Sequence, residues 1–194
     1  MKMIDLTSQL TSDAFLRNAH AGTHVDAPAY IFDGGKTIDQ FKPEVFVGNA
    51  VLLDLTHKKP SEPIDDEDLE AAEERAGLAV REGEIVILYT GGENSIHGEG
   101  PSAASYPYLS ENGAQYLEFK RVTMVGIDTP NIDPPNSKPL PAHATLLRKE
   151  ILVLENLCNL DEIEQPRFRL AALPLKLKAS TSPVRAVAIL ADPV

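Results

Sequence analysis

The residues best suited to chemistry lie in one short segment near the N-terminus. Residues 18–30 read Asn-Ala-His-Ala-Gly-Thr-His-Val-Asp-Ala-Pro-Ala-Tyr, which places His20, His24 and Asp26 at even positions. Side chains alternate between the two faces of an extended chain, so these three are expected to project from one side. Gly22 shares their parity and leaves room between them for an ion. A helix would turn Asp26 away from the histidines, and glycine, proline and β-branched residues disfavour one here.

The donor types in this segment predict a metal centre. Neutral imidazole and carboxylate together suit zinc, manganese or iron(II), and three protein ligands with open coordination positions suit catalysis better than a structural role. Taken alone, the segment leaves another interpretation open, in which the two histidines and the aspartate only hydrogen-bond within a tight loop.

Three further candidates lie downstream. His143 stands at the start of a predicted helix over 141–149, and Glu155 follows the apolar run 151–154. A carboxylate at the end of a buried strand costs free energy unless it is paired or binds a metal. His97 lies in a glycine-rich loop after a predicted strand, where ligands of open α/β sheets often bind, and is a candidate for proton transfer. An exposed loop histidine is the simpler interpretation of His97.

The elements that must position these residues follow from the apolar pattern. Short β-branched runs predict strands over 47–55, 85–89, 122–127, 151–154, 167–175 and 184–190. Helices are predicted over 65–76, 110–119 and 141–149. Because strands outnumber helices and the last two strands follow one another directly, we expect an α/β fold with a mixed sheet and packed helices. With 194 residues and no visible linker, we expect residues 1–194 to form a single domain.

Composition narrows the function classes. A formal net charge of -11 repels phosphate, so we expect no binding to nucleic acid or anionic membranes. Eight of the 29 acidic residues lie between Glu62 and Glu74, a run interpreted as a solvated helix face. The single cysteine, Cys158, suits a reducing compartment. The N-terminus does not read as a signal peptide, and no apolar run approaches the ~18 residues of a membrane span, so a cytoplasmic location is expected.

Three separated motifs carry a family resemblance. They are His-Ala-Gly-Thr-His-Val-Asp-Ala-Pro from residue 20, Gly-Ile-Asp-Thr-Pro-Asn-Ile-Asp-Pro from residue 126, and His143 followed by Glu-Asn-Leu from residue 155. A Ser-Pro-Val-Arg-Ala-Val run from residue 182 is also similar. In this order they resemble the cyclase-family metal hydrolases, which include bacterial kynurenine formamidase and isatin hydrolase.

The resemblance implies a swivelling β/β/α fold, a small-molecule substrate and a homo-oligomer, a dimer or larger. It implies hydrolysis of an amide, formamide or cyclic amide or ester by metal-activated water. One or two divalent ions, zinc or manganese, are implied. Asp128 and Asp133 are interpreted as loop-capping residues. The implied metal ligands are His20, His24, Asp26, His143 and Glu155.

One departure from the family concerns catalysis. The family segment usually carries a histidine, taken as the catalytic acid/base, four residues after the aspartate, where this chain has Tyr30. A phenol with an ordinary pKa of about 10 is a poor base, but it can donate a hydrogen bond to an oxyanion. Glu155 and His97 are then the candidate proton carriers.

Two alternatives to a hydrolase remain. A non-catalytic metal-binding relative would explain Tyr30. An iron(II) oxygenase would use two histidines and one carboxylate, but it usually has an all-β fold and leaves His20 and Glu155 without a role.

Overall fold

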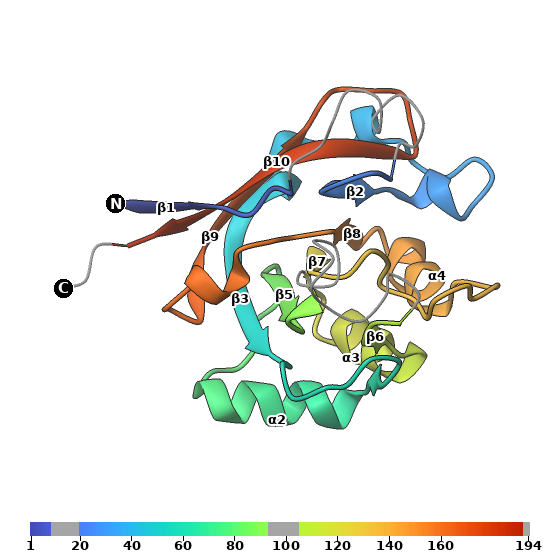
Figure 1. The fold of residues 1–194 in the computed structure, drawn as a ribbon. Helices are drawn as coiled ribbons and strands as arrows, with labels where there is room; N and C mark the ends of the chain where they lie inside the picture. Colours follow the sequence, from blue (N-terminus) through green and yellow to red (C-terminus); the bar gives the residue numbers. More distant parts are fainter. Residues whose placement is uncertain (9–19, 93–104, 192–194) are drawn as a thin grey trace.

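The structure, a computed structural model, describes residues 1–8, 20–92 and 105–191 (Figure 1). Its main feature is one mixed sheet with three helices packed against it. The sheet contains β1 (Lys2–Asp5), β2 (His24–Asp26), β3 (Val47–Asp54), β5 (Ile85–Tyr89), β7 (Met124–Ile127), β8 (Leu152–Glu155), β9 (Arg167–Pro174) and β10 (Thr181–Leu190).

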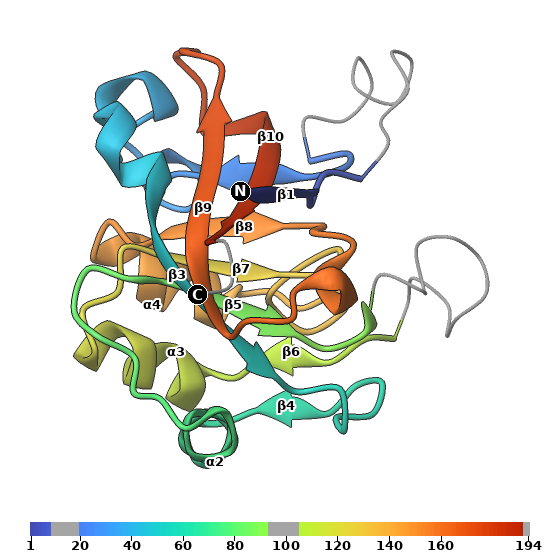
Figure 2. The same ribbon diagram turned by 90° about the vertical axis from the view of Figure 1, so that its left-hand side faces the viewer.

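The sheet curls into a barrel-like ring. Its strand order is β1-β10-β2-β8-β7-β5-β3-β9, and β9 also pairs with β10. Strands β3, β5, β7 and β8 are mutually parallel, whereas β2, β9 and β10 pair antiparallel with their neighbours. Figure 2 shows the long strand β10 beside both β9 and β1. The expected mixed α/β sheet is confirmed.

The helices are α2 (Asp66–Ala76), α3 (Glu111–Phe119) and α4 (Pro141–Arg148), each within one residue of its predicted bounds. Local caps fix two of them. Asp65 and Asp68 form a capping box at the start of α2, and Gly77 ends it with a left-handed φ of 62°. Ser110 accepts a hydrogen bond from the amide of Gly113 at the start of α3. Among the described residues, no helix is both long and apolar enough to cross a membrane.

Strand β3 illustrates why the strands read as continuous apolar runs. Ala50 and Leu52 pack in the cluster inside the ring, while Val51 and Leu53 pack in the cluster beneath the helices. Both faces of the strand are therefore buried, as expected for parallel strands covered by helices. Burying a valine or leucine side chain completely contributes about 1.5–3 kcal/mol of transfer free energy.

The structure corrects the expected extended conformation of the first motif. Only His24–Asp26 forms a strand, and residues 20–23 form a turn and bends. Gly22 adopts a left-handed φ of 68°, which a residue with a side chain rarely takes. The chain therefore bends just before β2 instead of running straight through the motif.

Several short elements give no clear signal in the sequence. Besides β1, they are β4 (Pro63–Ile64), β6 (Tyr108–Leu109) and the 3-10 helices η1 (Pro28–Tyr30), η2 (Ile38–Gln40), η3 (Pro43–Phe46) and η5 (Leu160–Glu162). Strands β4 and β6 pair in parallel as a separate two-stranded sheet.

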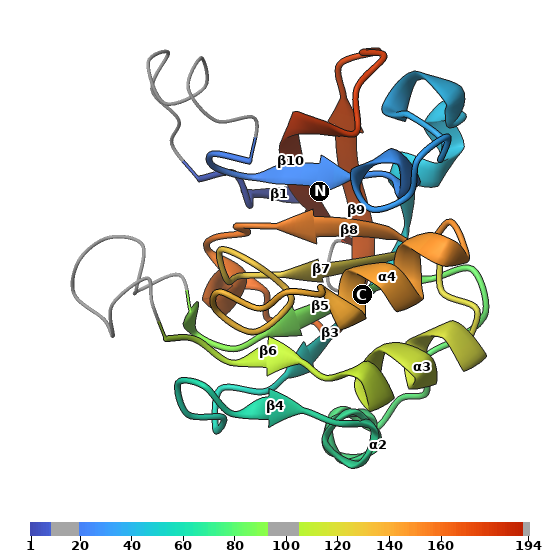
Figure 3. The same ribbon diagram turned by 90° about the vertical axis from the view of Figure 1, so that its right-hand side faces the viewer.

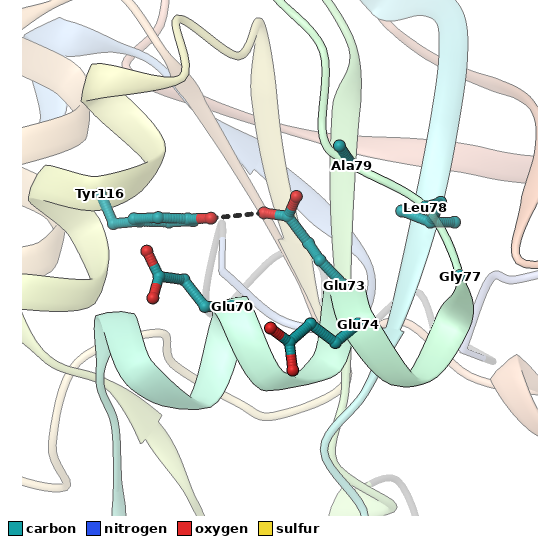
Figure 4. Close-up of a pocket in the computed structure, with 7 residues that line it drawn as sticks. All are labelled: Glu70, Glu73, Glu74, Gly77, Leu78, Ala79 and Tyr116. Atoms are coloured by element: carbon teal, nitrogen blue, oxygen red, sulfur yellow. Dashed lines mark hydrogen bonds between the residues drawn. The ribbon is translucent and has the colours of Figure 1, made fainter.

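The acidic run on α2 is not wholly a solvated face, which corrects the sequence interpretation. Glu73 is only 6 % exposed because it shares the inner side of α2 with Leu69. Its carboxylate accepts hydrogen bonds from the Tyr116 hydroxyl (2.6 Å), the Val80 amide (2.8 Å) and Lys120 Nζ (3.3 Å). A wide cleft borders this carboxylate, with other acids of α2 on its rim (Figure 4).

Candidate metal centre

Two of the candidate ligands, His24 and Glu155, are cross-strand neighbours. Strands β2 and β8 pair antiparallel, and their register places His24 directly opposite Glu155. The distance from His24 Nε2 to Glu155 Oε2 is 3.2 Å. On its other edge β2 pairs with β10, which sets Asp26 opposite Thr181. Because β2 is paired on both edges, its backbone holds these side chains in fixed directions.

Thr23 reinforces this alignment, although the sequence analysis did not single it out. Its buried hydroxyl donates a hydrogen bond to the carbonyl of Asn156 (2.6 Å) and accepts one from the amide of Ser8 (2.8 Å). The residues next to His24 and Glu155 are thus tied together by a side chain as well as by the strand pairing.

Helix α4 brings in the third candidate ligand. His143 Nε2 lies 3.4 Å from both Asp26 Oδ2 and Glu155 Oε1. His143 Nδ1 lies 2.6 Å from Asp133 Oδ2, and the carboxylate of Asp133 also accepts hydrogen bonds from the amides of Ala142 and His143. The expected loop-capping role of Asp133 differs from what the structure shows: its carboxylate bonds the first amides of α4 and the imidazole of His143, contacts that spacing did not reveal.

The tautomers of two histidines follow from their partners. A carbonyl oxygen accepts only, so His24 Nδ1, 2.8 Å from the carbonyl of Gly22, carries the hydrogen. The same reasoning with the carboxylate of Asp133 places a hydrogen on His143 Nδ1. In its neutral form each ring would therefore direct the lone pair of Nε2 toward the cluster, which is the arrangement that a metal ligand needs.

His20 completes the cluster from the bend before β2. Its Nδ1 lies 3.1 Å from His24 Nε2 and 3.4 Å from Asp26 Oδ1. Its side chain is 30 % exposed, whereas those of His24 and Asp26 are fully buried. This side of the cluster is therefore the more accessible to solvent.

The donor atoms fit a cation. Ligand atoms of His20, His24 and Asp26 all lie within 4.8 Å of one another, and so do those of Asp26, His143 and Glu155. Both carboxylate oxygens of Asp26 and the Nε2 of His143 are buried without a hydrogen-bond partner in the described part of the protein. Their separations of 3.4–3.6 Å are those of atoms that converge on a shared point rather than bond one another.

The pKa shifts of the clustered residues also indicate a site that favours a cation. Burial by itself lowers the pKa of His24 and His143, but the carboxylates of Asp26 and Glu155, joined at His143 by Asp133, raise both pKa values to about 10. Burial raises the pKa of Asp26, and contacts with three histidines outweigh it and hold that pKa well below its usual range. The cluster is thus a buried, negatively charged site that favours positive charge.

Tyr30 borders the cluster. Its ring centroid lies 4.6 Å from that of His20 and 5.2 Å from that of His143. Burial and the negative charges of Asp26, Glu155 and Asp133 raise the pKa of Tyr30 to about 12. The phenol therefore stays protonated near neutrality and is a hydrogen-bond donor rather than a base.

Two other residues from the sequence analysis lie away from the cluster or beyond the structure. His97 lies outside the described residues. Asp128 is fully buried and accepts hydrogen bonds from the amide and hydroxyl of Thr90 and from the amide of Gly92. It fixes the chain just after β5, rather than capping its own loop as expected.

Solved structures with a similar fold give the first comparison with known proteins. A potential metal-dependent hydrolase with cyclase activity superimposes with a TM-score of 0.80 at 26 % identity, over 99 % of both chains. Isatin hydrolase A from Ralstonia solanacearum has a TM-score of 0.79, covering 96 % of this chain and 91 % of its own, and at 24 % identity this likeness concerns the fold alone. Fold and donor set together define the class of metal-dependent hydrolases, not an all-β oxygenase.

Sequence comparison narrows that class to a family. The model of the Cyclase family matches residues 4–134. The kynurenine formamidase of Bacillus cereus is 35 % identical over 170 residues, which are 87 % of this chain and 75 % of the relative, and that of Geobacillus thermodenitrificans is 34 % identical over the same shares. The chain belongs to the Cyclase family.

Proposed function

We propose that the protein hydrolyses a small amide, formamide, or cyclic amide or ester with the help of a divalent metal. The proposed ligands are His20, His24, Asp26, His143 and Glu155. The observation that carries the proposal is the orphaned carboxylate of Asp26, buried among nitrogen and oxygen donors that converge within 4.8 Å. No hydrogen bond from a described residue satisfies that carboxylate, and a cation would.

We propose zinc or manganese as the metal, with one or two ions bound. Support for two ions comes from the two overlapping donor sets, which share Asp26. A carboxylate with two free oxygens can bridge two cations, one toward His20 and His24 and the other toward His143 and Glu155. A bound divalent ion would acidify a water molecule and polarise the substrate carbonyl.

The protein residues divide the remaining work. Asp133 holds the His143 ring in the orientation and tautomer that present Nε2. Glu155 Oε1 accepts a hydrogen bond from the amide of Ile132 (2.7 Å), which fixes the carboxylate. Its Oε2 is the proposed acceptor for the proton released by the attacking water. Tyr30 is the proposed donor to the developing oxyanion, because its hydroxyl stays protonated.

A formamide is the proposed substrate type, because the similar curated proteins at 33–35 % identity are kynurenine formamidases. Tyr30 argues for weak hydrolysis of N-formylkynurenine itself, since a protonated phenol cannot act as the family's usual base. His97 remains a candidate second proton carrier.

The test uses purified protein loaded with Zn²⁺ or Mn²⁺ and a panel of N-formylkynurenine, formylanilides, isatin and simple lactones. We expect turnover of at least one compound, and faster N-formylkynurenine hydrolysis in Tyr30→His. Tyr30→Phe is the matched control, which keeps the ring contacts and removes only the hydroxyl. Metal-loaded protein that is inert to the whole panel, before and after Tyr30→His, would sink the catalytic proposal.

That inert outcome would favour the second candidate, a metal-binding protein without catalysis. The observation behind this candidate is Tyr30 at the position of the family's usual acid/base. It predicts full metal binding together with no turnover.

We also propose a cytoplasmic location and a homo-oligomeric state. The chain has a single cysteine, the buried Cys158, which suits a reducing compartment. Three exposed leucines follow one another at alternate positions at the end of β9 and in the connection to β10, and such apolar surface often marks an interface. They are Leu173, Leu175 and Leu177. Analytical ultracentrifugation checks the oligomer, and a monomer at all concentrations would contradict it.

A further inference from the structure

The hydroxyl groups of Ser8 and Thr23 form a buried unit that the proposed chemistry does not use. Ser8 is 7 % exposed and Thr23 is 2 % exposed. The one hydrogen of the Thr23 hydroxyl goes to the carbonyl of Asn156 (2.6 Å), because a carbonyl oxygen only accepts. The two hydroxyl oxygens lie 3.1 Å apart, so Ser8 is the donor of the bond between them. With the amide of Ser8 as a second donor (2.8 Å), the capacity of Thr23 Oγ1 is filled.

This unit joins segments that are far apart in the sequence. Ser8 follows β1, Thr23 immediately precedes β2, and Asn156 immediately follows β8. The carbonyl of Thr23 also accepts a hydrogen bond from the amide of Val184 in β10 (3.1 Å). In Figure 3 the blue strand β2 runs beside the orange strand β8, and the unit lies at one end of this strand pair.

The N-terminal segment has further contacts that hold it in place. The amide of Leu6 donates to the carbonyl of Ala186 (2.9 Å), and the amide of Cys158 donates to the carbonyl of Leu6 (3.2 Å). Thr7 pairs with Leu157 in an isolated antiparallel bridge. The segment is therefore fixed between β10 and the chain that follows β8, so that it presents Ser8 to Thr23 from a rigid position.

The ladder between β2 and β8 ends at two candidate ligands. Its last pair in this direction is His24 with Glu155. Asn156 has a left-handed φ of 58°, so the chain turns immediately after Glu155. Ends of paired elements open more readily than their middles, whereas a metal site needs ligands held to about 0.5 Å. The hydrogen bond from Thr23 to Asn156 continues the connection one residue beyond the ladder, where the strands alone would separate.

We propose that Thr23, held by Ser8, is a positioning residue of the candidate metal centre. Its hydroxyl closes the end of the β2–β8 pair and keeps His24 and Glu155 at the separation that a shared cation needs. The N-terminal segment thereby supports the site through Ser8, although it supplies no proposed ligand. This inference rests on the proposed function.

The first test measures the affinity for Zn²⁺ by competition with a chromophoric chelator. Thr23→Val keeps the shape of the side chain and removes the hydroxyl, so the affinity should fall about tenfold, as at the low end for changes next to metal ligands. Ser8→Ala removes one of the two donors to Thr23 and should lower the affinity about two- to threefold. Thr23→Ser restores the hydroxyl and should stay within about twofold of the wild type.

Glu73→Ala is the control for lost stability. It breaks a buried hydrogen-bond network beside α2 and leaves the strand pair intact. Because the metal affinity of the folded protein does not depend on its free energy of unfolding, Glu73→Ala should bind Zn²⁺ as the wild type does. The visible spectrum of Co²⁺-loaded protein reports ligand geometry and should change in Thr23→Val but not in Thr23→Ser or Glu73→Ala.

A second measurement needs neither metal nor turnover. In the metal-free protein, amide hydrogen exchange in β2 and β8 should be roughly tenfold faster in Thr23→Val than in the wild type, with a smaller change in β5. Glu73→Ala should show no such preference for β2 and β8. If the wild type binds no divalent metal, the proposed function fails while the exchange still decides whether Thr23 holds the strand pair. Wild-type Zn²⁺ affinity in Thr23→Val, or exchange accelerated equally in β2, β5 and β8, would overturn the inference.

Discussion

Two regions of this molecule bury carboxylates, and they do so in opposite ways. Beside α2, Glu73 receives an amide, a hydroxyl and an ammonium group, so that both of its oxygens are bonded. At the candidate metal centre, both oxygens of Asp26 lack a hydrogen-bond partner among the described residues. A cleft borders Glu73, whereas the donor atoms that converge lie around Asp26.

Both carboxylates are buried, so burial does not distinguish them. The difference lies in whether the hydrogen-bonding capacity of the carboxylate is filled by the protein. A buried carboxylate whose hydrogen bonds are complete stabilises the fold and has no capacity left for a ligand. A buried carboxylate without hydrogen-bond partners, surrounded by other donor atoms, costs free energy unless it binds a ligand such as a cation.

The largest effect expected from this contrast follows from Asp26→Asn. The amide keeps the volume but removes the charge shared by both donor sets, so we expect loss of bound metal and activity at background level. Elemental analysis after dialysis and the substrate panel measure both. Glu73→Gln is the matched control and should retain wild-type metal content. Equal metal in Asp26→Asn and the wild type would erase the contrast.

A smaller effect is expected from Asp133→Asn. The amide is a weaker acceptor for the hydrogen on His143 Nδ1, so the imidazole loses part of its orientation and basicity. Metal affinity should fall roughly 10- to 100-fold, as is typical when the partner of a ligand is changed. Competition with a chromophoric chelator gives the affinity, and Asp161→Asn, at an exposed position, is the control. Unchanged affinity would show that the 2.6 Å contact has no influence on binding.

Glu73→Ala should affect stability alone. It strands the Val80 amide and the Tyr116 hydroxyl, which should reduce the free energy of unfolding by about 2–3 kcal/mol. Urea denaturation of the metal-free protein measures the change, and Glu70→Ala, on the exposed side of α2, should stay within about 0.5 kcal/mol of wild type. Lost metal binding in Glu73→Ala would mean that the two regions are not independent.

The last expected effect concerns the pH dependence of stability and the buried carboxyl of Asp128. Burial outweighs its hydrogen bonds and raises its pKa from 3.8 to about 6. A raised carboxyl pKa stabilises the fold fully below about pH 4, and this contribution is lost as the pH rises through about 6. The stability of the wild type relative to Asp128→Asn should therefore fall by roughly 2–3 kcal/mol between about pH 4 and pH 7. Urea titrations of both metal-free proteins measure it; a constant difference would contradict the assigned shift.

Much of the fold was predictable because its signals are local. The ends of α2 depend on Asp65 and Gly77, and the start of α3 depends on Ser110, all of which act within a few residues of their own position. The strand runs were predictable because both faces of strands such as β3 are buried. Strands β1 and β6 were missed because they are short and gain order from distant partners.

The candidate site likewise has features that the sequence reveals and features that depend on tertiary structure. The types and spacing of His20, His24 and Asp26 are visible in one segment, and the structure brings His143 and Glu155 to them. The contacts of Asp133 depend on how the loop between β7 and α4 folds, which no spacing in the sequence encodes. The expected extended conformation of the first motif was also wrong, because Gly22 bends the chain before β2.

The pairing of β2 also determines when the candidate metal centre can form during protein synthesis. Strand β2 carries His24 and Asp26, but the strands on its two edges, β8 and β10, are made more than a hundred residues later. On the ribosome β2 therefore lacks its strand partners until β8 and β10 have left the exit tunnel. Capture of the cation is then among the last events in maturation, and a nascent chain interrupted before residue 181 has no closed ring in which to hold it.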